Sequence, residues 1–291
     1  MRPPGSEEQP GLFAAPQRLF PCTPSKLGTY ADCQRRYRYV YVDRPAPRRG
    51  PPWAHNSLGA SVHGALRAWY LLPATRRADS AIPSLLRAAW VAEGYRDDAQ
   101  AAGAYQQALT WLEAYLADLD PGIEPVGVER VVAAKTATLA FSGRVDRIAR
   151  AGAGLAIIDY KTGRRPLTVD DARGSQALAL YAFAAERVFH RPCRRVELHH
   201  LPTRSIAVHE HTDQSLACQV RRAEETAAEA RAAESALAGG ADPDATFPAS
   251  VGPQCAWCDF RRTCPEGERV PAREPWAAMD NRGIRDFSPD R

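Results

Sequence analysis

Two acidic residues and a lysine are expected to meet near the turn of a β-hairpin. The residues on either side of the Ala- and Gly-rich turn 151–154 have the β-branched and apolar composition of strands. A loop at 151–154 pairs Asp146 with Asp159 across the hairpin. Lys161 follows Asp159 by two residues, so both side chains lie on the same face of the strand. The sequence therefore predicts two carboxylates and an ammonium group at one spot.

This arrangement of charges suits a divalent metal ion. Two carboxylates ~5 Å apart repel each other by about 3 kcal/mol at an effective dielectric constant of about 20. A cation between them relieves the repulsion, and Mg²⁺ or Mn²⁺ prefers such oxygen ligands. Lys161 would hold a water molecule that attacks phosphorus, or neutralise the charge that develops there. The alternative is a surface hairpin with a simple ion pair, but the apolar run 155–158 before Asp159 favours a buried strand.

The pattern of apolar residues predicts a mixed α/β domain in which helices precede, interrupt and follow a small sheet. Leu58, Val62, Leu66 and Tyr70 recur at a helical spacing, whereas partial alternation marks the strands. The proline-rich segment 44–53 is expected to be a connector. The expected helices cover 25–39, 58–70, 84–95, 99–118, 174–190 and 213–238, and the expected strands cover 125–133, 136–150, 155–161, 194–201 and 205–211.

Length and composition exclude few classes of protein. The 291 residues are enough for one large domain or two small ones, and the net charge of +4 is compatible with a polyanionic partner. No apolar run approaches the ~18 residues of a membrane span, and residues 1–10 have no apolar signal core. We therefore expect a cytoplasmic protein without membrane association.

Only three of the 38 basic residues are lysines, which points to Lys26, Lys135 and Lys161 as places where an ammonium group is needed.

Three of the seven cysteines are close together in the pattern Cys255-x-x-Cys258-x5-Cys264. A chain without a secretory signal is not expected to form a disulfide framework, so the cluster indicates metal binding. Thiolates suit zinc or an iron–sulfur cluster, and the spacing alone does not choose between them. Cys264-Pro265 is similar to the Cys-Pro ending of ferredoxin-type runs. A fourth ligand must come from elsewhere in the chain.

Several motifs follow one another between residues 25 and 264. They are Ser25-x-Leu27-x-x-Tyr30-x-x-Cys33, Gly59-x-x-Val62-His63, Gly143-x-x-Asp146-Arg147, Ile158-Asp159-Tyr160-Lys161-Thr162-Gly163 and Gln176-x4-Tyr181. In this order they resemble the PD-(D/E)xK nuclease superfamily, specifically its RecB-like exonuclease branch, which includes the nuclease modules of recombination helicase–nucleases and the CRISPR adaptation exonucleases. The resemblance implies a restriction-endonuclease-like core with a mixed central sheet flanked by helices.

The resemblance also implies roles for individual residues. His63, Asp146 and Asp159 would bind the divalent metal together with the backbone carbonyl of Tyr160, and Lys161 would be the catalytic lysine. Gln176 and Tyr181 would line the active site and contact the nucleic-acid backbone. Glu129 occupies a place where relatives often have an acid on the preceding strand, and we rank it second.

A 4Fe–4S cluster is a further implication of the resemblance. Cys33 would join Cys255, Cys258 and Cys264 as ligands, with Cys22 as the rival of Cys33. Such a cluster would connect the two ends of the nuclease domain and serve a structural role. The expected organisation is a disordered N-terminus (1–20), a nuclease domain (21–247), a cysteine cluster closing onto Cys33 (248–270) and a loose C-terminal tail (271–291).

Basic residues near these motifs fit a path for DNA. Arg35 and Arg36 alternate with tyrosines that include Tyr37, which would combine phosphate contacts with stacking platforms. A solvated helix face with its tyrosines packed inward is the alternative. Arg164 and Arg165 flank the predicted active-site strand and could also reach phosphates.

These observations favour a metal-dependent DNA exonuclease that hydrolyses phosphodiester bonds, on single-stranded ends, in recombination or repair. No Gly-x4-Gly-Lys-Ser/Thr phosphate loop occurs in the chain, so a helicase or other ATPase would be a separate partner. A catalytically silent iron–sulfur DNA-binding module is the second hypothesis, although the intact set of His63, Asp146, Asp159 and Lys161 argues against it. A zinc-stapled endonuclease is the third.

Overall fold

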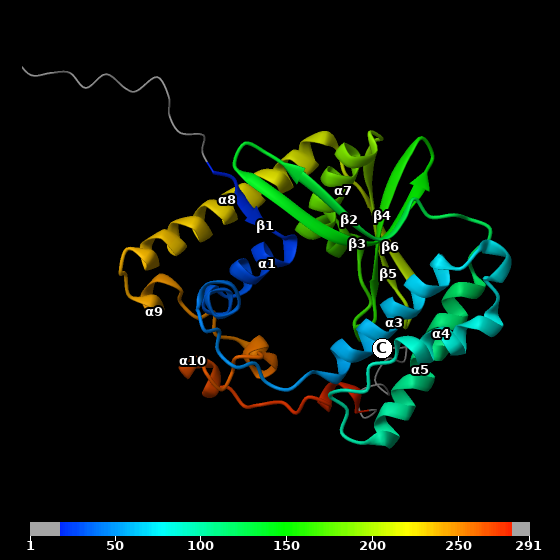
Figure 1. Ribbon diagram of the computed structural model, residues 1–291, viewed down its shortest axis with the longest axis horizontal. Coiled ribbons are helices and arrows are strands. Elements are labelled where there is room, and N and C mark those ends of the chain that lie inside the picture. The colour runs from blue at the N-terminus through cyan, green and yellow to red at the C-terminus, as the bar shows by residue number, and fades with distance from the viewer. Residues whose placement is uncertain (1–17, 281–291) are drawn as a thin grey trace, which may run out of the picture.

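The computed structural model describes residues 18–280, which form a six-stranded mixed sheet with helices on both faces (Figure 1). The strand order is β1-β3-β4-β5-β6, and β2 pairs with β3 away from this path. The pairs β1–β3 and β4–β5 are parallel and the others are antiparallel. The predicted mixed α/β fold is confirmed. The strands are β1 (Phe20–Cys22), β2 (Gly127–Lys135), β3 (Leu139–Ala151), β4 (Gly154–Lys161), β5 (Cys193–His200) and β6 (Ser205–Glu210).

The predicted β3–β4 hairpin is confirmed together with its register. Arg147 pairs with Ile158, so Asp146 and Asp159 occupy the next positions of the two strands. The turn is tighter than expected, because pairing continues to Ala151 and Gly154 and leaves only two loop residues. Gly152 in this loop has a φ of +56°, as two-residue hairpin turns require.

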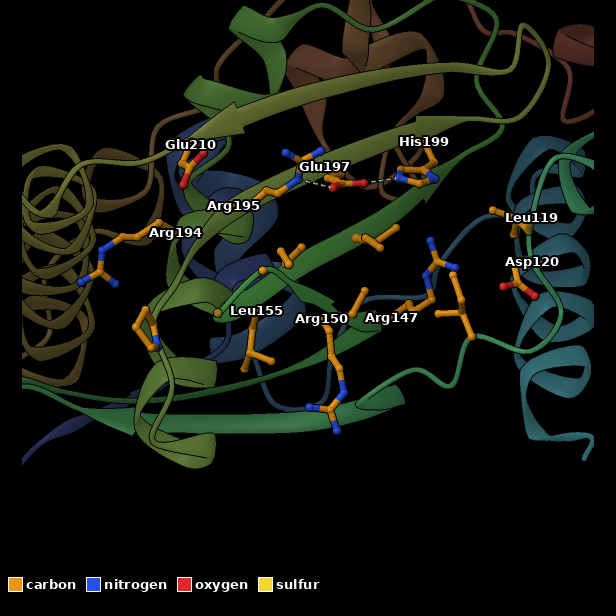
Figure 2. Close-up of a pocket in the computed structure, with 18 of the residues that line it drawn as sticks. Leu119, Asp120, Arg147, Arg150, Leu155, Arg194, Arg195, Glu197, His199 and Glu210 are labelled. Atoms are coloured by element: carbon orange, nitrogen blue, oxygen red, sulfur yellow. Dashed lines mark hydrogen bonds and ion pairs between the residues drawn. The ribbon is translucent and has the colours of Figure 1, made fainter. Parts of the chain in front are cut away.

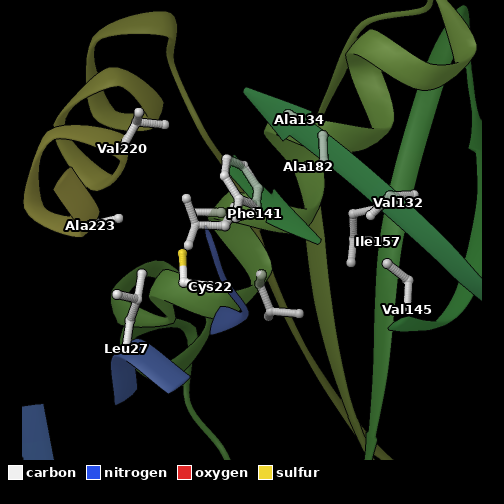
Figure 3. Packing of buried hydrophobic residues seen from close by; sticks show 14 of the residues in the cluster. Cys22, Leu27, Val132, Ala134, Phe141, Val145, Ile157, Ala182, Val220 and Ala223 are labelled. Carbon is white, nitrogen blue, oxygen red and sulfur yellow. The ribbon is translucent and has the colours of Figure 1, made fainter. Parts of the chain in front are cut away.

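One face of the sheet is covered by α1 (Pro24–Asp32), α7 (Gln176–Phe189) and α8 (Asp213–Ala238). Figure 3 shows Phe141 and Ile157 of the sheet packed with Ala182 of α7 and Val220 of α8. The side of α7 that packs here consists largely of alanines, all fully buried, so the helix lies close to the sheet. This close packing brings α7 against the strands that carry the acidic residues.

The other face is covered by α3 (Ala54–Leu71), α4 (Ile82–Ala89) and α5 (Asp98–Ala117). Ile158 and Tyr160 of β4 point to this side and pack among the helices. Gly64 allows α3 to approach α4, since a Cβ there would lie 2.9 Å from the Cβ of Ala89. The sheet is therefore fixed from both sides around the end of β4.

Some elements differ from the expectation. The expected helix 25–39 is interrupted at Cys33, whose extended backbone (φ −163°, ψ 111°) separates α1 from α2 (Gln34–Tyr37). A π-helical turn, Arg38–Val42, follows α2. Neither β1 nor α6 (Val169–Gly174) was predicted from the pattern. The remaining short elements are α9 (Pro243–Thr246), α10 (Pro265–Glu268) and the 3-10 helices Ala74–Arg76, Asp79–Ala81, Pro253–Trp257 and Ala277–Met279.

The described residues cover only part of the two chain ends for which the sequence makes predictions. The expected disorder of residues 1–20 falls mostly outside the described residues, but β1 begins at Phe20. Of the expected loose tail, 281–291 lies outside the described residues and 277–279 forms a 3-10 helix. Among residues 18–280, no helix combines the length and the apolar character that a membrane span requires.

The segment after α8 returns to the N-terminal helices, as Figure 1 shows for α9, α10 and α1. Arg35 holds the two parts together and is only 2% exposed. Its Nε donates to the carbonyl of Phe247 at 2.8 Å, and its Nη1 lies 3.3 Å from carboxylate oxygens of both Asp244 and Glu266. The backbone N–H of Gly50 also donates to the carbonyl of Asp259. Arg35 is thus part of the structural framework.

We predict that Arg35→Met lowers the free energy of unfolding by about 2 kcal/mol, because it leaves the buried carbonyl of Phe247 without its donor. Arg36→Met, at the exposed neighbouring position, is the matched control and should change the stability by less than about 0.5 kcal/mol. Urea unfolding followed by circular dichroism measures both. Equal stabilities of the two variants would contradict the structural role of Arg35.

Candidate functional site

Three acidic residues lie side by side on three neighbouring strands. The β2–β3 register places Glu129 opposite Asp146, between the pairs Val128–Arg147 and Arg130–Val145. The β3–β4 hairpin places Asp159 beside Asp146 on the other side. The structure therefore brings together the predicted pair of aspartates and adds the acid that the sequence ranked second.

The backbone of Glu129 adopts an unusual conformation. Its φ of +47° lies in the left-handed region, which a non-glycine residue within a strand rarely enters. Backbone strain of this kind costs about 1–3 kcal/mol and persists only where the surroundings impose it. Here it occurs at the one residue of β2 that lies opposite Asp146.

His63 on α3 reaches the same place. Its Nδ1 lies 3.4 Å from Oδ2 of Asp146, and its Nε2 lies 3.0 Å from the backbone carbonyl of Tyr160. Gly59, one turn earlier, allows this approach, because a Cβ there would lie 3.3 Å from Oγ1 of Thr162. The Gly-x-x-x-His spacing thus serves the close contact between α3 and the end of β4.

The peptide of Tyr160 connects these residues. Its N–H donates to Oδ2 of Asp146 at 2.9 Å, and its carbonyl lies next to His63. One backbone unit of β4 is therefore in contact with side chains from both β3 and α3.

Lys161 and Asp159 form the second half of the site, with Nζ 2.5 Å from Oδ2. The sequence predicted that the two side chains share a face, and the structure places them in contact. Lys161 is exposed, whereas Asp159 is largely buried.

The electrostatics of the site favour a cation. Burial raises the pKa of Asp159, the Lys161 ammonium opposes this shift, and the charge of Asp146 adds to it. Burial also raises the pKa of Glu129, again helped by Asp146. Burial disfavours the charged form of His63, but the hydrogen bond to Asp146 and the nearby carboxylates outweigh it and raise the pKa of His63. The negative charge of Asp146 contributes to all three shifts, and a cation would stabilise the ionised carboxylates.

A metal ion fits the donor set. Within residues 18–280, His63, Glu129 and Asp146 are the one group of three metal-binding side chains whose ligand atoms all lie within 4.8 Å of one another. An imidazole with carboxylates and a nearby backbone carbonyl can coordinate a divalent cation. Asp159 lies just outside this group.

Of the two residues of α7 predicted for the site, Tyr181 lies close to the acidic residues. The ring of Tyr181 lies against β3 at Gly143, where a Cβ would be only 2.3 Å from Cε1 of the ring. Burial and the charges of Asp159 and Asp146 raise the pKa of Tyr181 to about 12. Gln176 begins α7, directly after the N-cap Ser175. The glycine of the Gly-x-x-Asp motif therefore makes room for the tyrosine of the Gln-x4-Tyr motif.

Two arginines near the carboxylates were not singled out from the sequence. Arg144 of β3 has Nη1 3.8 Å from Oε2 of Glu129, and Arg67 lies one turn after His63 on α3. The positive charges of both lower the pKa of Glu129, against the effect of burial. Both side chains are exposed. The register of β2 with β3 and the i, i+4 spacing from His63 were the signals that could have found them.

The residues expected to contact DNA differ from one another in exposure and in their partners. Arg35 is buried in the framework described above and Tyr37 is 0% exposed, so neither is accessible to a polymer in this structure. The alternative of inward-packed tyrosines is correct for Tyr37. Arg36 is exposed. Arg164 donates to the carbonyl of Ala278 and Arg165 pairs with Asp171, and both remain exposed.

The predicted cysteine ligands share one neighbourhood at the junction of the two ends. Cys258 and Cys264 pack with Phe260, and the pKa of Cys258 is raised chiefly by burial, with a contribution from the nearby Cys33. Sγ of Cys255 lies 3.8 Å from the carbonyl of Ser250. In the part of the chain from 18 to 280, no three cysteine sulfurs lie within 4.8 Å of one another. The rival Cys22 is buried in the core between α1 and the sheet.

Comparisons with known proteins bear on the family and the fold. The PD-(D/E)XK nuclease superfamily matches residues 21–265. Among solved structures, the "Putative exonuclease" from Eubacterium rectale matches with a TM-score of 0.48 and 10% identity, covering 76% of this chain and 82% of that chain. The structure of SSO0001 matches with a TM-score of 0.38 and 16% identity, covering 86% and 89%. No curated protein matches the chain.

The family match includes the helix of His63, the three strands of Glu129, Asp146 and Asp159, and the helix of Tyr181. The chain belongs to the PD-(D/E)XK nuclease superfamily.

Proposed function

We propose that this protein is a metal-dependent DNA exonuclease that acts on single-stranded ends in recombination or repair. The proposal of a hydrolytic reaction rests on one observation. His63, Glu129 and Asp146 converge beside the ion pair of Asp159 and Lys161. The order of the motifs, which resembles the RecB-like branch, supports the choice of an exonuclease. A separate helicase would supply unwound ends.

The metal would be held by His63, Asp146 and Asp159, with the Tyr160 carbonyl as a further ligand and Glu129 as an additional carboxylate. When bound, Mg²⁺ or Mn²⁺ polarises a phosphoryl oxygen and lowers the pKa of a bound water. The carboxylates compensate the charge of the ion, and His63 must give up its proton before it can act as a ligand.

Lys161 is the group that would act on the reacting water. Its Nζ keeps donors free beyond the one that faces Asp159, because an ammonium group has three. It holds the water that attacks phosphorus and stabilises the charge that develops on the phosphoryl oxygens. Hydrolysis forms one bond from the water oxygen to phosphorus and breaks one ester bond, and the departing oxygen takes up a proton.

We expect Lys161→Met to lower the cleavage rate by about 100-fold or more at saturating metal, because the transition state loses a charged donor. The assay uses end-labelled linear single-stranded DNA with Mg²⁺ or Mn²⁺. Lys135→Met is the matched control, since Lys135 is an exposed lysine at the end of β2 and should retain wild-type activity.

Circular single-stranded DNA distinguishes the alternatives. Cutting of circles by the wild type would contradict an exonuclease and favour the endonuclease. Binding of linear DNA without cleavage would contradict the enzyme and favour the catalytically silent module. Full activity of Lys161→Met would remove the lysine from the mechanism.

Arg67 and Arg144 are proposed to hold the phosphates next to the scissile bond. They are exposed cations beside a carboxylate that would bind the metal, and a bound metal would also draw the DNA backbone to this place. Arg36, Arg164 and Arg165 would lie farther along the DNA. A charge-assisted contact of this kind contributes about 1.5–3 kcal/mol.

Arg144→Gln should therefore raise KM about tenfold or more while kcat changes little, and should reduce the salt dependence of DNA binding by about one counterion. KM at several salt concentrations measures both effects. Arg150→Gln, which removes an exposed arginine at the hairpin end of the same strand, is the control. An unchanged KM and salt slope for Arg144→Gln would refute its contact with DNA.

A 4Fe–4S cluster held by Cys33, Cys255, Cys258 and Cys264 is the second part of the proposal. The resemblance to the RecB-like branch favours iron–sulfur over zinc for this set. Cys33 contributes to the raised pKa of Cys258, so an N-terminal and a C-terminal member of the set lie near each other, which supports a shared site. The break between α1 and α2 at Cys33 supports it further, because the extended backbone there turns the chain at a ligand.

Anaerobically purified Cys258→Ser should lose most of its iron and unfold at a lower urea concentration, because the junction between the two ends loses its cluster. Cys218→Ser is the matched control, since Cys218 is exposed on α8 and should keep the wild-type iron content. Iron and zinc analysis together with the visible spectrum provide the readout. Zinc in place of iron in the wild type would favour the zinc-stapled alternative.

A further inference from the structure

We propose that Tyr115 and His199 are positioning residues that fix the Tyr160 peptide from the face of the sheet covered by α3 and α5, and so set the affinity of the site for a divalent metal. This inference rests on the proposed metal-dependent function. It concerns two residues that do not touch the metal ligands' side chains and that the motif pattern did not single out.

Tyr160 contributes to the site with its backbone and with its side chain. Its peptide N–H holds Asp146 and its carbonyl faces His63, as described above. Its side chain points into the core formed with α3 and α5 and is only 3% exposed. Whatever fixes the ring therefore also fixes the backbone groups that meet two metal-binding side chains.

Four aromatic or charged side chains from four elements surround the ring. One is His63 of α3, whose ring lies edge-on at a centroid distance of 5.9 Å. Tyr115 of α5 and His199 of β5 make edge-on contacts with it at centroid distances of 5.8 and 6.0 Å. The guanidinium of Arg147, from β3, lies 5.8 Å from the ring centroid. The ring is thus held by residues that are far apart along the chain.

A chain of hydrogen bonds holds these neighbours in turn. The Tyr115 hydroxyl lies 2.8 Å from Nδ1 of His199, and Nε2 of His199 lies 2.7 Å from Oε2 of Glu197. Arg195 donates from Nε to Oε1 of Glu197 at 2.6 Å. Figure 2 shows the part of this chain from Arg195 through Glu197 to His199, along the wall of a groove of about 660 Å³.

The directions of these bonds follow from the charges. Burial alone would raise the pKa of Glu197, but the bonds from His199 and Arg195 outweigh it and lower this pKa to about 2. Glu197 is therefore an ionised acceptor, so Nε2 of His199 carries the proton. Burial lowers the pKa of His199, which leaves Nδ1 as an acceptor for the hydroxyl of Tyr115. The chain then has a single direction, and each member fixes the next.

Arg147 extends the same arrangement to the helix of His63. It follows Asp146 in β3, and its Nη2 lies 3.4 Å from the Tyr115 hydroxyl. Its Nη1 donates to the hydroxyl of Tyr70, which lies two turns after His63 on α3. The Tyr115 hydroxyl is therefore the point where contacts from β3, α5 and β5 meet behind the site.

Partners behind metal ligands of this kind typically change metal affinity by about 10–100-fold when they are removed. The test is a calorimetric titration of Mn²⁺ into the metal-free protein without DNA. Tyr115→Phe keeps the ring and removes the hydroxyl, and we expect its dissociation constant for Mn²⁺ to rise about tenfold.

Tyr105→Phe is the matched control. Tyr105 is on the same helix, and its hydroxyl donates to the carbonyl of Pro83 at 3.0 Å, away from the site. Tyr105→Phe loses the bond to Pro83, and Tyr115→Phe loses the contacts to His199 and Arg147, so both should unfold at somewhat lower urea concentrations. Only Tyr115→Phe should bind Mn²⁺ more weakly, which a general loss of stability does not explain.

Three outcomes decide the inference. Wild-type Mn²⁺ affinity in folded Tyr115→Phe would overturn it while the proposed function stands. A wild-type protein that binds no Mn²⁺ would overturn the proposed function and the inference with it. If Tyr115→Phe does not fold, the same titration on His199→Gln decides, with weaker Mn²⁺ binding expected and unchanged binding overturning the inference.

Discussion

Repulsion between carboxylates is the constraint on which the rest of this structure depends. Glu129, Asp146 and Asp159 occupy neighbouring positions on three strands, and each close pair of such charges costs about 3 kcal/mol at an effective dielectric constant of about 20. Three groups offset part of this repulsion: the imidazole of His63, the ammonium of Lys161 and the N–H of Tyr160. Burial, helped by the charge of Asp146, still raises the pKa values of Glu129 and Asp159. A divalent cation would stabilise their ionised forms.

Holding such charges together requires a frame that does not relax. β3 is shared by two antiparallel ladders, and the end of β4 is packed by α7 on one face and by α3 and α5 on the other. The left-handed backbone of Glu129 persists within this frame, although the same strain in a free strand would relax. The glycines at 59 and 143 allow a helix and a tyrosine ring to approach the strands closely. Packing on both faces thus keeps the acidic residues in place.

Local patterns in the sequence predicted the parts of the site that depend on local structure. The hairpin register follows from a short turn, so the pairing of Asp146 with Asp159 could be predicted, and the helical spacing placed His63 on α3. The importance of Glu129 depends on the β2–β3 register and on a backbone angle, neither of which the composition reveals. The interior position of Arg35 arises from contacts with residues more than 200 positions away, such as Phe247. The three-residue β1 pairs with the distant β3, with Phe20 opposite Leu139, and carries no periodic signal.

The scarcity of lysine has a physical reason at two of its three positions. Lys26 lies over the ring of Phe20 at 4.3 Å and 3.5 Å from Glu234, so it packs within an aromatic cluster. At Lys161 the geometry of the charge matters more. The planar fork of an arginine would pair with both oxygens of Asp159 and direct its donors into that one contact. The compact ammonium of Lys161 contacts one oxygen of Asp159 and keeps other donors for a water or a phosphate. A chain that uses arginine for almost every positive charge therefore keeps lysine where the charge must be shared between two partners.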